Sequence, residues 1–291
     1  MPLFFSLSGF LFYKSISKNG SALHWGNFWS YTKKKFFRLM VPYFIIAFIW
    51  MDPIKYIVGF YECLDEHLIA SQLTGIGNGH LWFLYCLFVI SLFSKILLKI
   101  SYNWKSDILL LLIFVLLHLF NNLIPSVFAL RQTSYYEVYF YCGYLFSKYV
   151  FLRHVLSIRM KVWLIIILWT IGTLINNYSE TLSHGVLVKI ASLVLCVSIL
   201  WLIYNISFSK FYKSKFLNLI SECSLGIYLL HSPLIYIIYS YYANLQPIFI
   251  LILNFLVFGT ISLLLTIFIK KSRLKMIIGE KRITEKSNKH T

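Results

Sequence analysis

The sequence predicts an all-α protein, a polytopic bundle of membrane helices with about nine membrane segments. Of its 291 residues, 59% are hydrophobic and only 13% are charged, whereas soluble domains carry about 25% charged residues. Long apolar stretches recur along the whole chain, and most approach the ~20 residues with which a helix spans a bilayer. Since such a chain cannot cover itself with polar surface, we expect 1–291 to form a single membrane-embedded domain.

The predicted segments follow one another with short polar connections. They are 2–13, 41–61, 80–98, 108–125, 135–152, 162–178, 184–206, 217–242 and 248–269. The first segment is the weakest, because as a helix it would extend only about 18 Å. Nine segments with a cytoplasmic C-terminus would also place Met1 outside the cell. We therefore expect a further helix ahead of Met1.

Positive charge is concentrated in alternate connections, although the chain as a whole carries a net charge of +17. The basic regions are 14–38, 95–105, 148–161, 210–215 and the tail 270–291. The connections between them are acidic or nearly uncharged. Cytoplasmic loops of membrane proteins are enriched in Lys and Arg. The alternation therefore predicts a cytoplasmic tail, and it explains the charge by membrane topology and lipid contact rather than by a nucleic-acid partner.

One polar stripe interrupts the apolar segment 217–242. Ser221, Ser224, Tyr228 and His231 are spaced by three, four and three residues, so they share one helical face. Polar groups inside a bilayer often mark function, although interhelical hydrogen bonding would also explain them. We take His231 and Tyr228 as candidate catalytic residues and Ser224 as a candidate substrate-binding residue.

A basic cluster stands at the cytoplasmic start of the segment 41–61. Its members are Lys33, Lys34, Lys35 and Arg38. Arg binds phosphate through two parallel hydrogen bonds and Lys binds it as a point charge. The cluster is therefore a candidate phosphate site, with anionic lipid headgroups as the alternative ligand.

A glycine-rich stretch, 75–79, leads into His80 and Trp82 at the outer start of the segment 80–98. A mobile loop followed by an imidazole and an indole could form an acceptor site, with His80 as a second catalytic candidate. Trp82 could equally anchor the segment at the membrane interface. The five cysteines show no metal-binding spacing, so we expect no metal and no tightly bound cofactor.

Four of these patterns occur together in a way that resembles a known family. They are Phe4-Phe5-Ser6-Leu7-Ser8-Gly9-Phe10, the basic run ending in Arg38 with Pro42-Tyr43, Leu81-Trp82-Phe83-Leu84, and Ser224-Leu225-Gly226-Ile227-Tyr228-Leu229-Leu230-His231. In this order they resemble the integral-membrane acyltransferases of family 3, which O-acylate surface sugars in bacteria. The resemblance covers nearly the whole chain.

The resemblance implies ten membrane helices in the bacterial inner membrane. It implies acyl transfer from acyl-coenzyme A, usually acetyl-CoA, to a sugar hydroxyl of a cell-surface polysaccharide or lipid-linked glycan. The family's paired arginines resemble Lys35 and Arg38. We therefore expect the donor phosphates to bind Lys33, Lys34, Lys35 and Arg38, and the thioester to enter a cavity lined by Ser8, Tyr228 and His231.

The family's catalytic His lies on its first helix and has no counterpart in this sequence. His231 is therefore the substitute candidate for the base that activates the hydroxyl, and His80 is the second. Two alternatives stay open. An inactive, truncated copy of such an enzyme would explain the motifs. A non-enzymatic permease or flippase for lipid-linked sugars would explain the helices and the polar stripe, but not the motifs occurring together.

Overall fold

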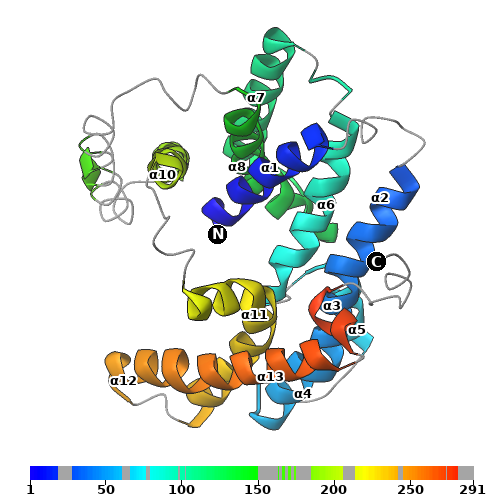
Figure 1. Cartoon of the computed structure of the whole chain (residues 1–291), viewed down its shortest axis with the longest axis vertical. Coiled ribbons are helices and arrows are strands. Elements are labelled where there is room, and N and C mark those ends of the chain that lie inside the picture. The colour runs from blue at the N-terminus through cyan, green and yellow to red at the C-terminus, as the bar shows by residue number, and fades with distance from the viewer. Residues whose placement is uncertain are drawn as a thin grey trace, which may run out of the picture. The chain divides into compact units, whose positions relative to one another are not determined.

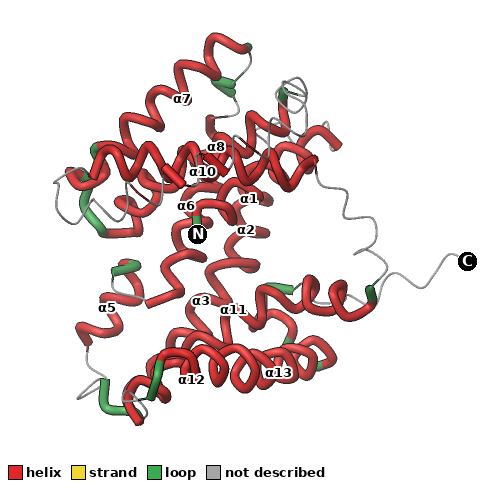
Figure 2. The backbone as a smooth tube through the Cα atoms, turned by 90° about the vertical axis from the view of Figure 1, so that its left-hand side faces the viewer, coloured by secondary structure: helices red, strands yellow, loops and turns green. Residues whose placement is uncertain are grey.

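The computed structural model describes residues 1–18, 28–60, 66–76, 79–97, 99–101, 103–149, 185–205, 214–241, 245–272 and 274–280, together with isolated helical positions between 163 and 174. Within these ranges the chain forms helices joined by turns, and none of them is a strand (Figure 2). The predicted all-α class is thus confirmed.

Among the described residues, four stretches are long and apolar enough to cross a bilayer. They are Phe28–Ile57, Glu66–Leu97, Lys215–Tyr241 and Pro247–Lys271, and Val188–Leu200 is a shorter apolar helix. The predicted segment 162–178 lies almost entirely outside the described residues, so the count of nine stays a prediction. The first helix, α1 (Pro2–Lys18), has 17 residues, or about 25 Å. It is longer than the predicted 2–13 because the polar residues after Tyr13 continue it.

The chain divides into two compact units, each of which is described by itself. Unit 1 contains Met1–Phe28 and Val89–Phe208, and unit 2 contains Trp29–Phe88 and Ser209–Thr291. The helix α6 (Trp82–Leu97) contributes residues to both.

Unit 1 is built around a close crossing of α1 with α8 (Leu130–Lys148), and α7 (Trp104–Leu119) and α10 (Gly185–Asn205) pack beside this pair (Figure 1). A Cβ atom on Gly143 would lie 1.8 Å from the backbone oxygen of Ser6, and one on Gly9 would lie 1.9 Å from that of Phe140. Small residues permit such backbone contact between membrane helices. Ser6 strengthens the crossing, because its hydroxyl donates to the backbone oxygen of Tyr139 at 2.9 Å.

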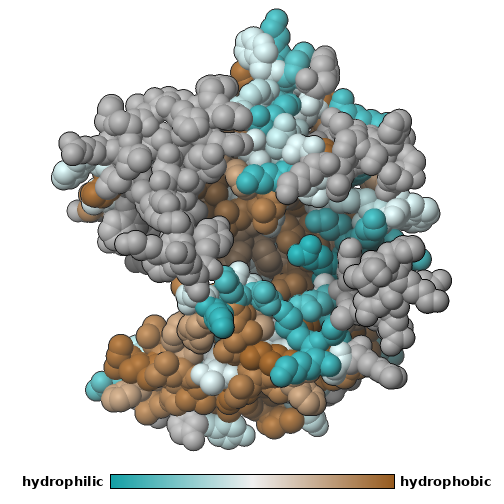
Figure 3. All heavy atoms as spheres, in the orientation of Figure 1, coloured by the Kyte–Doolittle hydropathy of each residue, from teal (hydrophilic) through white to brown (hydrophobic). Residues whose placement is uncertain are grey.

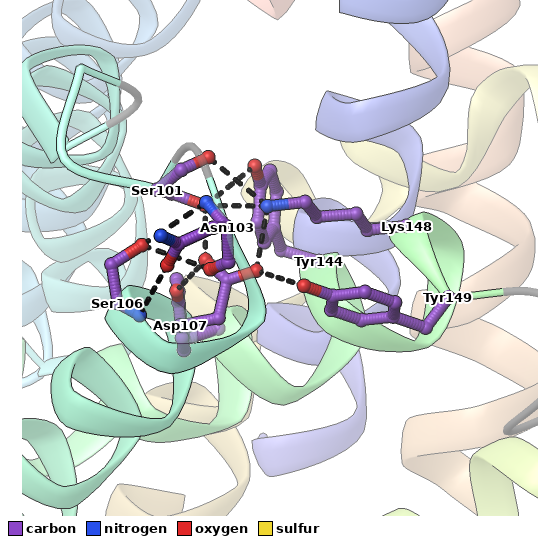
Figure 4. A network of polar contacts seen from close by, with 8 residues as sticks. Ser101, Asn103, Ser106, Asp107, Tyr144, Lys148 and Tyr149 are labelled. Carbon is purple, nitrogen blue, oxygen red and sulfur yellow. Dashed lines mark hydrogen bonds and ion pairs between the residues drawn. The ribbon is translucent and has the colours of Figure 1, made fainter.

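A polar cluster around Asp107 ties the first turn of α7 to the end of α8 (Figure 4). The Oδ2 atom of Asp107 accepts hydrogen bonds from Lys148 Nζ and the Tyr149 hydroxyl, both at 2.6 Å. Its Oδ1 atom accepts from the hydroxyls of Tyr141, at 2.9 Å, and Ser101. Both carboxylate oxygens therefore have two donors each, and Asp107 is only 1% exposed.

The first long helical run of unit 2 changes its winding twice. It begins as α2 (Phe28–Lys35), continues through the π-helix η3 (Phe36–Met40), α3 (Val41–Ile46) and the π-helix η4 (Ala47–Met51), and ends as α4 (Asp52–Ile57). Pro42 and Pro53 explain both changes, because proline has no N–H for the carbonyl four residues earlier and its ring clashes with that carbonyl. Wider π-type turns relieve the clash and are frequent at functional sites.

The rest of unit 2 consists of short elements and two long helical runs. The helix α5 (Glu66–Thr74) and the 3-10 turn η5 (Gly79–Leu81) precede α6, and α11 (Lys215–Tyr241) is followed by α12 (Pro247–Ile252), η10 (Leu253–Phe258), α13 (Gly259–Lys271) and η11 (Lys275–Ile278). Gly226 lets α11 approach α13, because a Cβ atom there would lie 2.4 Å from Thr266 Cγ2. Apolar side chains cover the visible face of α12 and α13 (Figure 3), as expected for a helix that faces lipid.

Candidate functional site

A cavity of about 180 Å³ lies in unit 2 where Arg38 faces α11. Ser221, Glu222 and Ser224 line it from α11, and Gly279 and Glu280 line it from the segment after η11. Arg38 and Ser224 are exposed. The Ser224 hydroxyl donates to the backbone oxygen of Ser221 at 2.9 Å, which leaves its oxygen able to accept a hydrogen bond from a ligand. Two hydroxyls and a guanidinium thus face the same space.

The backbone around Arg38 explains how this cavity is built. Pro42 cannot donate a hydrogen bond to the Arg38 carbonyl, and the backbone there winds as the π-helix η3. Gly279 packs against that carbonyl, since a Cβ atom on Gly279 would lie 2.5 Å from the Arg38 oxygen. Gly279 also has φ +75°, which glycine adopts without the penalty that a Cβ atom would add. The segment 275–280 is thereby held against Arg38.

The charges around the cavity are partly balanced. Lys270 lies 3.0 Å from the Glu280 carboxylate and 3.8 Å from that of Glu222. Arg38 forms no ion pair with another residue in the described part of unit 2. Among the described residues, no carboxylate forms an ion pair with the guanidinium of this cavity, so it is available to an anionic ligand.

The three lysines of the predicted phosphate cluster are placed differently from Arg38. Lys33 and Lys34 are exposed in the last turn of α2. The Lys35 ammonium lies 5.6 Å from the centroid of the Tyr31 ring. None of the three lines the cavity. Their predicted contact with donor phosphates stays a prediction, and Arg38 is the member of the cluster that the cavity contains.

A second polar cluster of unit 2 is centred on His80 in η5. The Tyr228 hydroxyl of α11 donates a hydrogen bond to the His80 carbonyl, and the two rings meet edge to face with centroids 5.4 Å apart. Both ring nitrogens of His80 are buried, and neither forms a hydrogen bond of ordinary geometry with a described residue. The Leu229 carbonyl interacts with the ring, because Pro233 provides no N–H for that carbonyl. The backbone of His80 is therefore fixed by a hydrogen bond, whereas its ring nitrogens have no hydrogen bond of ordinary geometry among the described residues.

His231 lies on α11 three residues after Tyr228 and is half-buried. Its Nδ1 atom lies 2.8 Å from the Ile227 carbonyl, which can only accept, so Nδ1 carries the proton in the neutral ring. The lone pair is then on Nε2, the form that a general base requires. The predicted stripe on α11 is therefore divided. Ser221 and Ser224 line the cavity at Arg38, while Tyr228 bonds to the His80 carbonyl.

Three buried polar residues beside this cluster were not among the predicted site residues. Asp52 is 2% exposed, Lys55 6% and Gln72 1%. The Gln72 side-chain amide donates to both Asp52 oxygens, at 3.1 and 3.3 Å. The Tyr43 hydroxyl donates to the backbone carbonyl of Gln72 at 2.7 Å. The signal in the sequence was the pair of charges in an otherwise apolar run, since ionisable residues within a membrane segment are rare and often functional.

The other two predicted site residues are Trp82 and Ser8. Trp82 begins α6 two residues after His80, and its ring meets that of Phe83 with centroids 6.4 Å apart. Ser8 lies half-buried on α1 in unit 1. Its expected place beside Tyr228 and His231 stays a prediction.

Within the described residues, no three His, Cys, Asp or Glu side chains gather as a metal site would require. Neither the curated proteins nor the solved structures contain a match to the chain. The family model of acyltransferase family 3, described as an acyltransferase domain, matches residues 1–271. Arg38, Ser221 and Ser224 of the cavity lie within this match, as do His80 and His231, whereas Gly279 and Glu280 follow it. The chain thus belongs to acyltransferase family 3.

Proposed function

We propose that this membrane acyltransferase moves an acyl group, and specifically acetyl, from acyl-coenzyme A to a sugar hydroxyl. The acceptor is a cell-surface polysaccharide or a lipid-linked glycan of the cell envelope. The protein acts in the bacterial inner membrane with its C-terminus in the cytoplasm, where the donor is made. The charge alternation of the sequence and the family membership support this arrangement.

One observation carries the proposal, namely that the helix α11 presents two different chemistries along its length. Ser221 and Ser224 face Arg38 across a cavity of about 180 Å³, a donor set suited to phosphate oxygens. Ser224 and His231 are seven residues apart, or about 10 Å along the helix axis. Acyl-coenzyme A has the same layout, because its flexible pantetheine arm separates the phosphates from the reactive thioester.

The neutral imidazole of His231 provides the base for this reaction. As the acceptor oxygen bonds to the thioester carbon, its proton moves to Nε2 of His231, and the carbonyl electron pair moves onto the carbonyl oxygen. When this intermediate collapses, the carbon–sulfur bond breaks and the coenzyme A thiolate leaves. The thiolate takes the proton from the imidazolium and restores the enzyme. General base catalysis of this kind contributes about 10²–10⁴-fold to a rate.

Binding of acetyl-coenzyme A to the purified protein tests the donor site. We expect Arg38→Ala to raise the dissociation constant for acetyl-coenzyme A about 10- to 100-fold, since hydrogen bonds to charged groups contribute about 1.5–3 kcal/mol. Lys271→Ala is the matched control, because it removes an equal, exposed charge outside the cavity and outside the predicted phosphate cluster, and it should change affinity less than threefold. Equal affinity of Arg38→Ala and wild type would contradict the phosphate role.

The Glu280 carboxylate, which also lines the cavity, provides a second test, in which donor affinity is expected to rise. Glu280→Gln removes a negative charge that an anionic donor must approach, so it should tighten donor binding a few-fold. A protein that binds no acyl-coenzyme A, and whose activity in vesicles does not depend on it, would instead favour a permease or flippase for lipid-linked sugars.

A further inference from the structure

The donor cavity holds carboxylates as well as the guanidinium of Arg38. Glu222 and Glu280 both line it. An unpaired carboxylate in this space would attract the Arg38 cation and repel an anionic donor. In the structure, neither carboxylate forms an ion pair with Arg38 among the described residues. The contacts that the two carboxylates do make explain why.

Lys270, in the last turn of α13, is the cation that both carboxylates share. Its Nζ atom lies 3.0 Å from the Glu280 carboxylate and 3.8 Å from that of Glu222. It also donates a hydrogen bond to the Glu222 backbone carbonyl at 3.3 Å, which ties the ammonium to α11. Lys270 does not itself line the cavity. It therefore pairs with both carboxylates without occupying the space that faces Arg38.

The backbone that carries Glu280 is held in place by contacts other than Lys270. The Gly279 and Glu280 N–H groups each donate a hydrogen bond at 3.1 Å to a carbonyl of η11. Ile278 is 2% exposed, and a Cβ atom on Gly279 would lie 2.5 Å from the Arg38 carbonyl oxygen. Loss of the ion pair would therefore leave the Glu280 carboxylate at the cavity, one residue from this contact, with its negative charge unpaired.

We propose that Lys270 is a positioning residue of the donor site, which keeps Arg38 free for the phosphates of acyl-coenzyme A by pairing with the Glu280 carboxylate. The inference rests on the proposed function and adds the residue that controls the charge of its donor cavity. Lys270 lies within the residues 1–271 that the family model matches, whereas Glu280 follows them. Family membership alone therefore does not imply this pairing.

Glu280, rather than Glu222, is the carboxylate through which Lys270 acts. Its distance from the ammonium is the shorter of the two, and it directly follows the residue that packs against the Arg38 carbonyl. The Glu222 side chain is 71% exposed, so water and salt screen its charge. The Glu280 side chain is 36% exposed, and its charge acts more strongly within the cavity.

Titration of the purified full-length protein with acetyl-coenzyme A tests the role of Lys270. We expect Lys270→Met to raise the dissociation constant about five- to tenfold, because the Glu280 carboxylate then competes with the donor for Arg38. Lys270→Arg keeps the charge and should bind within twofold of wild type. Lys271→Met is the matched control, because it removes an equal, exposed charge at the next position, outside the cavity. It should also stay within twofold.

The double variant Lys270→Met/Glu280→Gln separates charge pairing from a structural role of Lys270. Removing the carboxylate should bring the dissociation constant back to within twofold of wild type. Glu280→Gln should therefore improve binding more in the Lys270→Met protein than in wild type. A merely structural role of Lys270 would leave the double variant as weak as Lys270→Met. In membrane vesicles that retain the acceptor, Lys270→Met should raise the donor KM while kcat stays within threefold of wild type.

The outcomes distinguish this inference from the function on which it rests. If wild type binds acetyl-coenzyme A and Arg38→Ala weakens that binding, but Lys270→Met binds as wild type, the Lys270 role is wrong and the proposed function stands. A double variant or an arginine variant as weak as Lys270→Met also overturns the role. If wild type binds no acetyl-coenzyme A, both proposals fail together. Lys270→Gln gives the same measurement should Lys270→Met not yield folded protein.

Discussion

The polar cluster around Asp107 in unit 1 and the one around His80 in unit 2 differ in one respect, namely the completeness of their hydrogen bonds. Four donors satisfy the two oxygens of Asp107, so nothing is left for a ligand. The two ring nitrogens of His80 are buried without an ordinary hydrogen bond among the described residues. A completed buried network stabilises a fold, whereas an incomplete one costs stability and is retained where a ligand completes it.

The same contrast applies to the ends of the charged side chains. In unit 1, the Lys148 ammonium forms an ion pair with Asp107 at 2.6 Å and donates a hydrogen bond to the Ser101 hydroxyl at 3.0 Å. In unit 2, Arg38 faces an open cavity and forms no ion pair with another described residue. Polar residues alone therefore do not identify a site in a membrane helix bundle. A site is indicated by polar groups that have no hydrogen-bond or ion-pair partner among the described residues.

The largest loss of stability is expected from Gly143→Leu, which disrupts the packing of α8 against α1 in the unit that contains the Asp107 cluster. A side chain there meets the backbone of α1, since even a Cβ atom would lie 1.8 Å from the Ser6 oxygen. We expect a loss above about 3 kcal/mol and little folded protein in size-exclusion chromatography. Gly259→Ala is the matched control, because the nearest atom to its Cβ atom would be the Asn254 backbone oxygen, at 3.9 Å. A monodisperse, active Gly143→Leu protein would refute the crossing.

His80→Phe separates stability from activity in unit 2. It keeps a planar ring and removes the two buried nitrogens, which make no ordinary hydrogen bond. We expect the melting temperature to change little, because no hydrogen bond of ordinary geometry to a described residue is lost. Acetyl transfer should fall about 10²–10⁴-fold. A variant that melts well below wild type would show that the His80 ring is a structural residue after all.

Asp107→Asn should give the reverse pattern. The amide cannot pair with the Lys148 ammonium, and its NH₂ group would point at hydroxyl and ammonium donors. We expect a loss of about 2–3 kcal/mol in stability, less than for a fully buried pair because Lys148 is 16% exposed. The donor dissociation constant of the folded fraction should be unchanged. Glu66→Gln, which removes an exposed carboxylate, is the thermal-melting control and should be silent.

The pH dependence of unfolding provides the smallest and most specific signal. Asp107 precedes the apolar segment 108–125. Burial alone would raise the pKa of its carboxyl, but the hydrogen bonds from its four donors outweigh burial and hold the pKa below the usual value. Because the folded pKa is lower than the unfolded one, this stabilisation is complete above pH ~4 and is lost as the pH falls through the folded pKa. Melting curves of wild type should show this acid loss, and those of Asp107→Asn should lack that component. Parallel curves would contradict the prediction.

Much of the fold could be predicted from periodicity and composition. The apolar stretches 217–242 and 248–269 correspond to the helical runs Lys215–Tyr241 and Pro247–Lys271, because a long apolar stretch satisfies its backbone in lipid only as a helix. The π-type turns at Arg38 and before Asp52 were not predicted. Proline signals a disturbed turn, but whether the chain kinks or widens depends on what packs against it.

The structure groups the predicted site residues differently from what helical spacing suggested. Ser224, Tyr228 and His231 share a helical face, and Tyr228 and His231 were expected to line the thioester cavity with Ser8. In the structure, Ser224 faces Arg38 while Tyr228 bonds to His80. Helical spacing defines the side of a helix on which residues lie, but not which partner lies opposite each turn. Lys55 was visible as a charge in an apolar run, but its proximity to Gly79 and Tyr236 depends on contacts between distant segments.

The sequence by itself determined that this chain is a bundle of membrane helices and which family it resembles, since both follow from local composition and from short motifs. The tertiary structure alone decided which polar groups are satisfied. Asp107 and His80 are each a single ionisable residue in the sequence. Only the packing of helices from distant parts of the chain gives one of them four donors and leaves the other open, because hydrogen-bond satisfaction is a property of neighbours in space.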